Sequence, residues 1–346
     1  MDRFTSRRGA RGLTVAACAI AIASASAQAA AQEFVMKVGT PTVRGQLEEW
    51  GRLLKEDVEG RTNGKMQVTV YPGSQLGSIP RMVEGAQLGT IEMVQVPPEF
   101  LSGIDERFAI FSAPAVLTGL WQGTHALNDP EFAKEFWQVG QDKGIKIVGH
   151  NCDAPSDYAT RNPIRKMDDF KGLKVRVFGS PLEREALSRL GATGVPMPLD
   201  EVLPAMQRRV IDGNKSGITV YTAFKYYDTV KNVFTAKESM ICVLKFLSKS
   251  WHDKLPAEMQ TVVWEEAQKA NKNVMPFTVN LVAQSYKIWT DNGGILTEFD
   301  ATEQARFYAL LEPVGGVVFK DKPKALALLE VLKKAAKRYK NTPSGN

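Results

Sequence analysis

The sequence has few of the residues, and none of the short motifs, that define the common classes of enzyme. Histidine occurs only at His125, His150 and His252, and no H-E-x-x-H or C-x-x-C pattern is present. The glycine-rich stretch at residues 60–65 is one residue too short for a phosphate-binding loop, and residues 213–217 are wrongly spaced for a G-x-S-x-G nucleophile motif. We therefore expect no metal, no cofactor and no enzymatic activity.

Cysteine is also scarce. Cys18 lies in the N-terminal segment, so only Cys152 and Cys242 remain in the rest of the chain. A disulfide is permitted in an exported protein, but two isolated cysteines do not establish one. The sequence leaves their pairing open.

The charged residues are spread too evenly for nucleic-acid binding. The formal net charge is +6, and residues 1–31, with four arginines and one aspartate, account for half of it. The remaining excess is too small for the basic stripe that a nucleic acid requires. With 44% hydrophobic residues in a chain of 346, the composition is that of a globular protein, and the length favours two domains.

The first 31 residues have the pattern of a secretory signal peptide. Four arginines are followed by an alanine-rich apolar run and by small residues that suit cleavage. A membrane anchor is the alternative, but the run is short for a span, and no later stretch is long and apolar enough to cross a bilayer. We expect a soluble periplasmic protein, with the Sec or Tat route of export left open.

Strands and helices alternate along the rest of the chain. The hydrophobic pattern predicts strands at residues 34–38, 66–71, 91–96, 145–148, 174–178 and 210–218. Helical spacing predicts helices at residues 47–58, 79–88, 132–139, 255–286 and 323–339. Two more helices are expected to begin at Ser180, in a capping box with Glu183, and at Asp200. This order predicts an α/β fold with largely parallel strands.

Arg176 stands out because it interrupts an apolar strand, between Val175 and Val177. A guanidinium group forms two parallel hydrogen bonds with a carboxylate. A helix that begins at Ser180 would also direct its first amides toward the same strand end. The residues alone leave two interpretations: a carboxylate site at the carboxyl end of the strand, or an edge-strand arginine paired with a surface carboxylate.

Four segments resemble the solute-binding proteins of tripartite (TRAP) transporters, the DctP-like family. Residues 71–77 (YPGSQLG) are similar to the family motif Y-P-x-x-Q-L-G, and residues 81–93 to the next block. Residues 171–177 (KGLKVRV) resemble the K-G-L-K-x-R-V strand, and residues 201–213 the block that follows. The segments occur in family order and spacing, and the resemblance extends over essentially the whole mature chain.

The resemblance implies an α/β, two-domain periplasmic-binding-protein fold (type II-like), with crossing strands and a long helix linking the domains. A signal peptide would occupy residues 1–31. The first domain would comprise residues 32–153 plus about 242–281, and the second residues 154–241 plus about 282–346. The two domains would close about crossing strands near residues 153 and 240.

The implied function is capture of a small organic acid between the closing domains and its delivery to the subunits of a TRAP membrane permease. We expect a monomer. Two alternatives remain open: a periplasmic enzyme that anchors a carboxylate substrate, and a sensory receptor for a carboxylate ligand.

By its place in the motif, Arg176 is the carboxylate-binding arginine of the family. Further residues are expected to supply aromatic walls and polar groups around the ligand: Thr40, Asn151, Tyr158, Phe178, Asn214, Ser216 and Tyr221.

The sequence also departs from members that bind sialic acid. Ser156 replaces their second arginine, and Pro97 and Phe100 lie where they carry charged residues. A less charged pocket disfavours a sugar acid rich in hydroxyls, whose donors would be left unpaired. The candidates are 2-oxo or 2-hydroxy acids, C4-dicarboxylates and aromatic acids.

Overall fold

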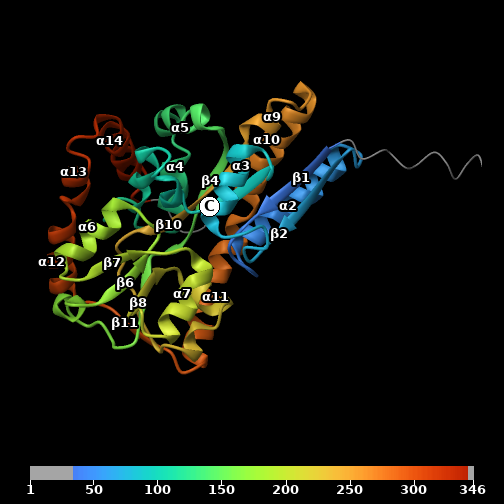
Figure 1. Cartoon of the computed structure of the whole chain (residues 1–346). Helices are drawn as coiled ribbons and strands as arrows, with labels where there is room; N and C mark the ends of the chain where they lie inside the picture. The colour runs from blue at the N-terminus through green and yellow to red at the C-terminus, as the bar shows by residue number, and fades with distance from the viewer. Residues whose placement is uncertain (1–33, 342–346) are drawn as a thin grey trace, which may run out of the picture.

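The computed structural model describes residues 34–341, which form two mixed sheets with helices packed around them (Figure 1). The expected signal peptide and Cys18 lie outside the described residues. None of the helices in the described part of the chain has the length and apolar character that a membrane span requires.

The first sheet has the strand order β2-β1-β3-β10-β4. Its strands are β1 (Phe34–Gly39), β2 (Met66–Tyr71), β3 (Met93–Val96), β4 (Ile145–Pro155) and β10 (Met240–Ser248). The neighbours β2, β1 and β3 run parallel, as predicted. β10 is antiparallel to both β3 and β4, so the prediction of largely parallel strands is wrong at this end of the sheet.

The second sheet has the strand order β11-β9-β5-β8-β6-β7. Its strands are β5 (Asp157–Thr160), β6 (Lys174–Val177), β7 (Thr193–Pro196), β8 (Gly213–Ser216), β9 (Asn232–Phe234) and β11 (Ile295–Thr297). β6 is parallel to both β7 and β8, whereas β5 is antiparallel to β8 and β9. The antiparallel pairs involve β5 and β10, the strands that the chain enters as it crosses from one sheet to the other, so both sheets are mixed.

Helices cover the sheets and connect them. Those before residue 200 are α2 (Gln46–Arg61), α3 (Ile79–Leu88), α4 (Leu120–Leu127), α5 (Pro130–Phe136), α6 (Pro181–Arg189) and α7 (Leu199–Gln207). The later ones are α8 (Ile218–Ala223), α9 (Lys249–His252), α10 (Ala257–Asn273), α11 (Met275–Asp291), α12 (Ala301–Leu311), α13 (Val314–Val318) and α14 (Pro323–Arg338). Short 3₁₀ helices include η1 (Pro98–Leu101) and η2 (Glu106–Ser112). The helix predicted at 79–88 matches α3, and the one predicted at 255–286 is divided into α10 and α11.

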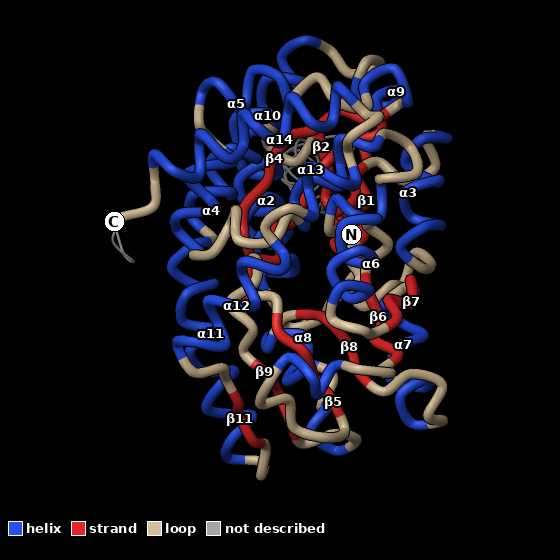
Figure 2. Tube along the Cα trace, turned by 90° about the vertical axis from the view of Figure 1, so that its left-hand side faces the viewer, coloured by secondary structure: helices blue, strands red, loops and turns tan. Residues whose placement is uncertain are grey.

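The chain crosses between the sheets at two adjacent places. Only Ser156 separates β4 from β5, and residues 235–239 join β9 to β10. The Ser156 N–H donates to the Ser239 carbonyl at 2.9 Å, so the two crossings lie side by side. In Figure 2 the labelled strands of the first sheet, β1, β2 and β4, lie in the upper half and those of the second sheet in the lower half. The expected crossing strands near residues 153 and 240 are confirmed.

A pair of consecutive helices also links the two halves. α10 packs on α2 and β4, and α11 contacts α8 and β11 as well as α2. In Figures 1 and 2, α10 lies beside the first sheet and α11 beside the second. The exact domain boundaries stay a prediction. Helix α14, placed in the second domain by that division, packs on α4 and α5, which the division places in the first.

The helix start predicted at Ser180 is confirmed, but its capping box and the start predicted at Asp200 are not. Ser180 caps α6, since its hydroxyl accepts the Leu182 N–H at 3.1 Å. The Glu183 carboxylate does not complete a capping box but accepts the Phe178 N–H at 3.0 Å. Pro198 is the N-cap of α7 and Asp200 lies in its first turn, where a negative charge is still favourable because of the helix dipole.

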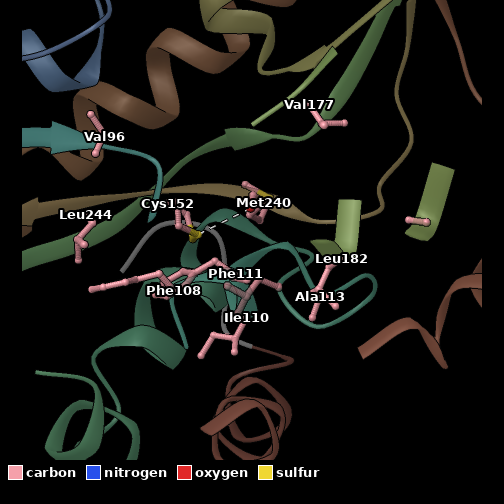
Figure 3. Packing of buried hydrophobic residues seen from close by; sticks show 14 of the residues in the cluster. Val96, Phe108, Ile110, Phe111, Ala113, Cys152, Val177, Leu182, Met240 and Leu244 are labelled. Carbon is pink, nitrogen blue, oxygen red and sulfur yellow. Dashed lines mark hydrogen bonds between the residues drawn. A yellow bond between two sulfur atoms is a disulfide. The ribbon is translucent and has the colours of Figure 1, made fainter. Parts of the chain in front are cut away.

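One continuous core joins the two sheets. It includes Val96 and Leu244 of the first sheet and Val177 of the second. The segment at residues 108–117 supplies Phe108 and Phe111, which lie together near Cys152 (Figure 3). Among residues 34–341, the packed apolar side chains therefore extend without a break from the first sheet to the second.

A disulfide joins Cys152 of β4 to Cys242 of β10. The two residues face each other directly across the antiparallel strands. α4 approaches so closely that a Cβ at Gly123 would lie 2.6 Å from the Cys152 Sγ. The pairing that the sequence left open is thus a crosslink between the two crossing strands.

We predict that this crosslink contributes substantially to stability. It closes a sequence separation of 90 residues, and such a crosslink restricts the unfolded chain. Replacing both cysteines by alanine should lower the free energy of unfolding by about 2–4 kcal/mol, measured by urea unfolding. Wild-type protein reduced with dithiothreitol is the control and should unfold at about the same urea concentration as the double-alanine variant. An unchanged midpoint in both samples would contradict the prediction.

Candidate ligand-binding site

Arg176 lies in the interior of the second sheet. In β6 it faces Val195 of β7 and Asn214 of β8, and its side chain is completely buried. β6 is therefore not an edge strand. Arg176 forms no salt bridge with any of residues 34–341, so the interpretation as an edge-strand arginine paired with a surface carboxylate is wrong.

The guanidinium of Arg176 is held by neutral groups. Its Nε donates to the Met197 carbonyl at 2.8 Å, and its Nη1 lies 3.4 Å from both the Asn214 Oδ1 and the Lys215 carbonyl. The other nitrogen, Nη2, is buried and has no hydrogen-bond partner in the described part of the chain. Burial lowers the pKa of Arg176, but a guanidinium stays charged in proteins. A desolvated cation with an unused donor results.

Two aromatic rings flank this cation. The guanidinium carbon lies 4.6 Å from the ring centroid of Phe178 and 5.8 Å from that of Phe100. Such contacts stabilise a desolvated cation through the negative faces of the rings. They also leave the buried Nη2, which has no partner among residues 34–341, available to donate to a carboxylate.

Arg176 lines a cavity between the two sheets. The walls come from both halves and from the crossing strands: Pro41, Thr42, Leu47, Ile79, Pro97, Phe100, Asp153, Arg176, Phe178, Leu199, Ser216, Val220, Ile241 and Val243. Most of these residues are apolar. The free space is about 30 Å³, enough for one or two water molecules. The walls must therefore separate before a larger molecule enters.

The cavity also contains a carboxylate that the sequence analysis missed. Asp153, at the end of β4, is 7% exposed. One oxygen, Oδ2, lies 3.2 Å from the Thr219 hydroxyl, while Oδ1 is buried without a partner among the described residues. Burial raises the pKa of Asp153 to about 6, although the Thr219 hydrogen bond and the positive charge of Lys245 oppose this increase. As with Arg176, the signal was a charged residue between two apolar ones, here Cys152 and Ala154.

The predicted site residues fall into two groups. Phe178 and Ser216 line the cavity with Arg176, and Asn214 contacts the guanidinium from behind. Thr40 and Asn151 are buried but do not line the cavity, although Pro41 and Thr42 beside Thr40 do.

Both predicted tyrosines lie away from the cavity, in the core of the second half. The Tyr158 hydroxyl donates to the Glu238 Oε2 at 2.6 Å, and its ring packs against Phe170. The Tyr221 hydroxyl lies 2.6 Å from the Asn214 carbonyl oxygen. The large aromatic area of each ring is buried, and each hydroxyl has a polar partner.

A cluster of buried charges lies behind Arg176. The Lys215 ammonium donates to the Glu238 carboxylate at 2.9 Å, and both side chains are essentially inaccessible to solvent. Glu99 of η1 accepts a hydrogen bond from the Ser112 hydroxyl at 2.9 Å, and its second oxygen has no partner within residues 34–341. Burial, and secondarily the negative charge of Glu183, raises the pKa of Glu99 to about 8. Glu99 is therefore mostly protonated at neutral pH.

The architecture and the cavity define the class of protein. Two mixed sheets, two crossing strands and a partly polar cavity between the sheets are the features of a two-domain solute-binding protein. The model of the DctP family, the bacterial extracellular solute-binding proteins of family 7, matches residues 41–321. The chain belongs to this family, which confirms the resemblance seen in the sequence.

Similar proteins of known sequence or structure agree with this assignment. The 2,3-diketo-L-gulonate-binding periplasmic protein YiaO of Escherichia coli (strain K12) is 25% identical over 279 residues, which cover 80% of this chain and 84% of that protein. A TRAP periplasmic solute-binding protein from Desulfovibrio salexigens, solved with bound orotic acid, superposes with a TM-score of 0.83 at 21% identity and covers 88% of this chain and 99% of its own. Another from Anaerococcus prevotii, with bound D-glucuronate, has a TM-score of 0.82 at 24% identity and the same coverage. These structures confirm the two-domain fold.

We predict that Glu99 makes stability depend on pH. Because its pKa is about 8 in the folded protein and 4.5 in the reference state, folding is linked to uptake of a proton between these values. The free energy of unfolding should therefore decrease as the pH rises from about 4.5 to 8. Glu99→Gln cannot ionise, so it should lose less stability than wild type between pH 5 and pH 8.5, by on the order of 2–4 kcal/mol.

Urea unfolding at pH 5, 7 and 8.5 measures this difference. Glu201→Gln, on the exposed surface of α7, is the matched control and should follow the wild type. Parallel pH dependences for wild type and Glu99→Gln would show that Glu99 is already ionised in the folded protein.

Proposed function

We propose that this protein captures a small organic acid in the cavity between its two sheets, with Arg176 as the carboxylate anchor. The observation that carries the proposal is the buried Nη2 of Arg176, which has no partner among residues 34–341. An unpaired buried donor of this kind is costly, and a ligand carboxylate would satisfy it. The pair would be strong because the surroundings exclude water.

The positions of the walls support capture by closure. Leu47 and Ile79 belong to helices beside the first sheet, whereas Leu199 and Val220 belong to helices beside the second. An acid bound between them would be in contact with both halves. Since the free space is only about 30 Å³, we infer that the halves separate to admit the ligand and close around it, with the two crossings as the hinge.

Arg176 would act together with three of the other predicted residues. Phe178 forms a wall, Ser216 offers a hydroxyl to the ligand, and Asn214 orients the guanidinium. Thr40, Asn151, Tyr158 and Tyr221 are left out of this proposed site because they do not line the cavity.

The similar proteins support both the ligand class and the transport role. The names of the three proteins described above mention 2,3-diketo-L-gulonate, orotic acid and D-glucuronate, and all three compounds are carboxylates. We infer that this chain is exported to the periplasm by the segment at residues 1–31 and delivers its acid, as a monomer, to a TRAP-type permease. Family membership favours this role over that of a periplasmic enzyme or a sensory receptor.

We predict that Arg176→Ala loses about 2–5 kcal/mol of binding free energy for the acid, the cost expected for truncating one partner of a buried charge pair. Arg176→Lys should also bind poorly, because an ammonium cannot form the two parallel hydrogen bonds. A thermal-shift screen of carboxylates identifies the acid, since a ligand at a hundred times its dissociation constant stabilises by about 2.7 kcal/mol. Titration calorimetry then compares the variants.

Arg208→Ala is the matched control, because Arg208 is exposed on the end of α7, and it should bind as the wild type does. Circular dichroism verifies that each variant is folded. Full affinity in folded Arg176→Ala protein would remove Arg176 from the site.

A further inference from the structure

The cavity contains an unused acceptor as well as an unused donor. Both the Asp153 Oδ1 and the Arg176 Nη2 are buried and lack a hydrogen-bond partner in the part of the chain described, and both residues line the same cavity. We propose that Asp153 is a second ligand-binding residue, which accepts a hydrogen bond from a hydroxyl or ammonium group carried by the acid on Arg176. This inference rests on the proposed function and narrows it.

The backbone around Asp153 is built to turn its side chain. The pairing of β4 with β10 shifts by one residue here, so that Ile241 faces Ala154 while Cys242 faces Cys152. Asp153 is thus the extra residue of a β-bulge and has no partner across the strands. Bulges are frequent next to binding sites, where they redirect one side chain without disturbing the rest of the sheet. Asp153 consequently faces the cavity while the neighbouring Cys152 is tied into the crosslink.

The hydrogen bonds of Asp153 leave one acceptor for a ligand. The Thr219 hydroxyl occupies Oδ2 at 3.2 Å, and no described group donates to Oδ1. An ionised carboxylate has no hydrogen to donate, so only a ligand group that carries a hydrogen can satisfy Oδ1. A keto oxygen or a second carboxylate would instead bring two acceptors together.

The rest of the cavity limits how polar the ligand can be. Of the described residues that line it, only Thr42, Asp153, Arg176 and Ser216 are polar, and the others are proline, aliphatic or phenylalanine side chains. A ligand with one carboxylate, one donor and an apolar skeleton fits this pattern. A sugar acid would leave several hydroxyls against apolar walls without partners. The geometry therefore favours apolar hydroxy or amino acids over keto acids, dicarboxylates and sugar acids.

Two matched series of probes test this preference on the wild-type protein. One is 3-methylbutanoate with its 2-hydroxy, 2-amino and 2-oxo derivatives, and the other is 3-phenylpropanoate with the same three derivatives. In at least one series, the hydroxy or amino acid should bind at least tenfold more tightly than both the unsubstituted and the 2-oxo acid in titration calorimetry, since an unsatisfied buried acceptor costs more than about 1 kcal/mol. Equal or tighter binding of the unsubstituted or 2-oxo acid in both series would overturn the proposal, and so would failure of every probe to bind.

Variants connect the preference to Asp153. Asp153→Leu should lose the tenfold discrimination between the hydroxy or amino acid and the unsubstituted acid. Asp153→Asn keeps an acceptor oxygen but no charge, so it should weaken the amino acid more than the hydroxy acid. Melting temperatures confirm that both variants are folded, and Asp153→Asn provides the test if Asp153→Leu does not fold. Unchanged discrimination in a folded variant would remove Asp153 from the site.

The outcomes separate this inference from the proposed function. If galacturonate or a dicarboxylate binds in place of the probes and Arg176→Ala abolishes that binding, the proposed function stands and the role of Asp153 falls. If a hydroxy or amino acid binds with the expected preference but Arg176→Ala does not weaken it, the anchor is wrong and the proposed function falls.

Discussion

The site depends on one desolvated guanidinium. Arg176 is buried against neutral partners and two aromatic rings, and burying a charge in this way is expensive unless other charges compensate. Burial lowers the pKa of Arg176, while the charges of more distant groups, Glu183 among them, favour its charged form. The cost of burying the charge is therefore offset by groups that do not line the cavity, such as Glu183. The guanidinium is therefore stable enough to exist unpaired and still lacks the direct partner that a ligand carboxylate can supply.

The charge cluster behind Arg176 connects the two halves of the molecule. Glu99 lies in η1, after the third strand of the first sheet, whereas Glu183 and Lys215 belong to the second half. Burial, and secondarily the negative charge of Glu183, raises the pKa of Glu99 and favours its protonated form. Phe100, the residue after Glu99 in η1, lies beside the guanidinium of Arg176. Because Glu99 and Phe100 are adjacent in η1, this segment contributes both to the buried charge cluster and to the aromatic wall beside Arg176.

The sequence predicted the elements better than it predicted where their side chains point. Helix α3 and strand β2 match the expected bounds, because each has one apolar face with a clear period. Arg176 was found because a charge inside an apolar strand needs a reason. Asp153 was missed, since its strand also carries Lys146, His150 and Asn151 and its direction depends on a one-residue bulge that no local pattern encodes. Tyr158 and Tyr221 were expected in the cavity and lie in the core. The placement of Tyr158 depends on the antiparallel register of β5 and β8, and that of Tyr221 on the packing of α8 against the Asn214 carbonyl of β8. The register of β4 and β10 likewise decided the pairing of the cysteines.

The crossing strands β4 and β10 both connect the two halves and form part of the cavity wall. They are the connection about which the halves would move, yet Asp153, Ile241 and Val243 on these strands also form part of the cavity wall. A wall that deformed with every movement would lose its alignment with Arg176. The crosslink between Cys152 and Cys242 lies directly beside these residues and fixes β4 to β10, so this part of the wall stays rigid. In the proposed closure, the segments beyond the crosslink, Ser156 and residues 235–239, would take up part of the movement, and the side walls would close over a base that keeps its shape.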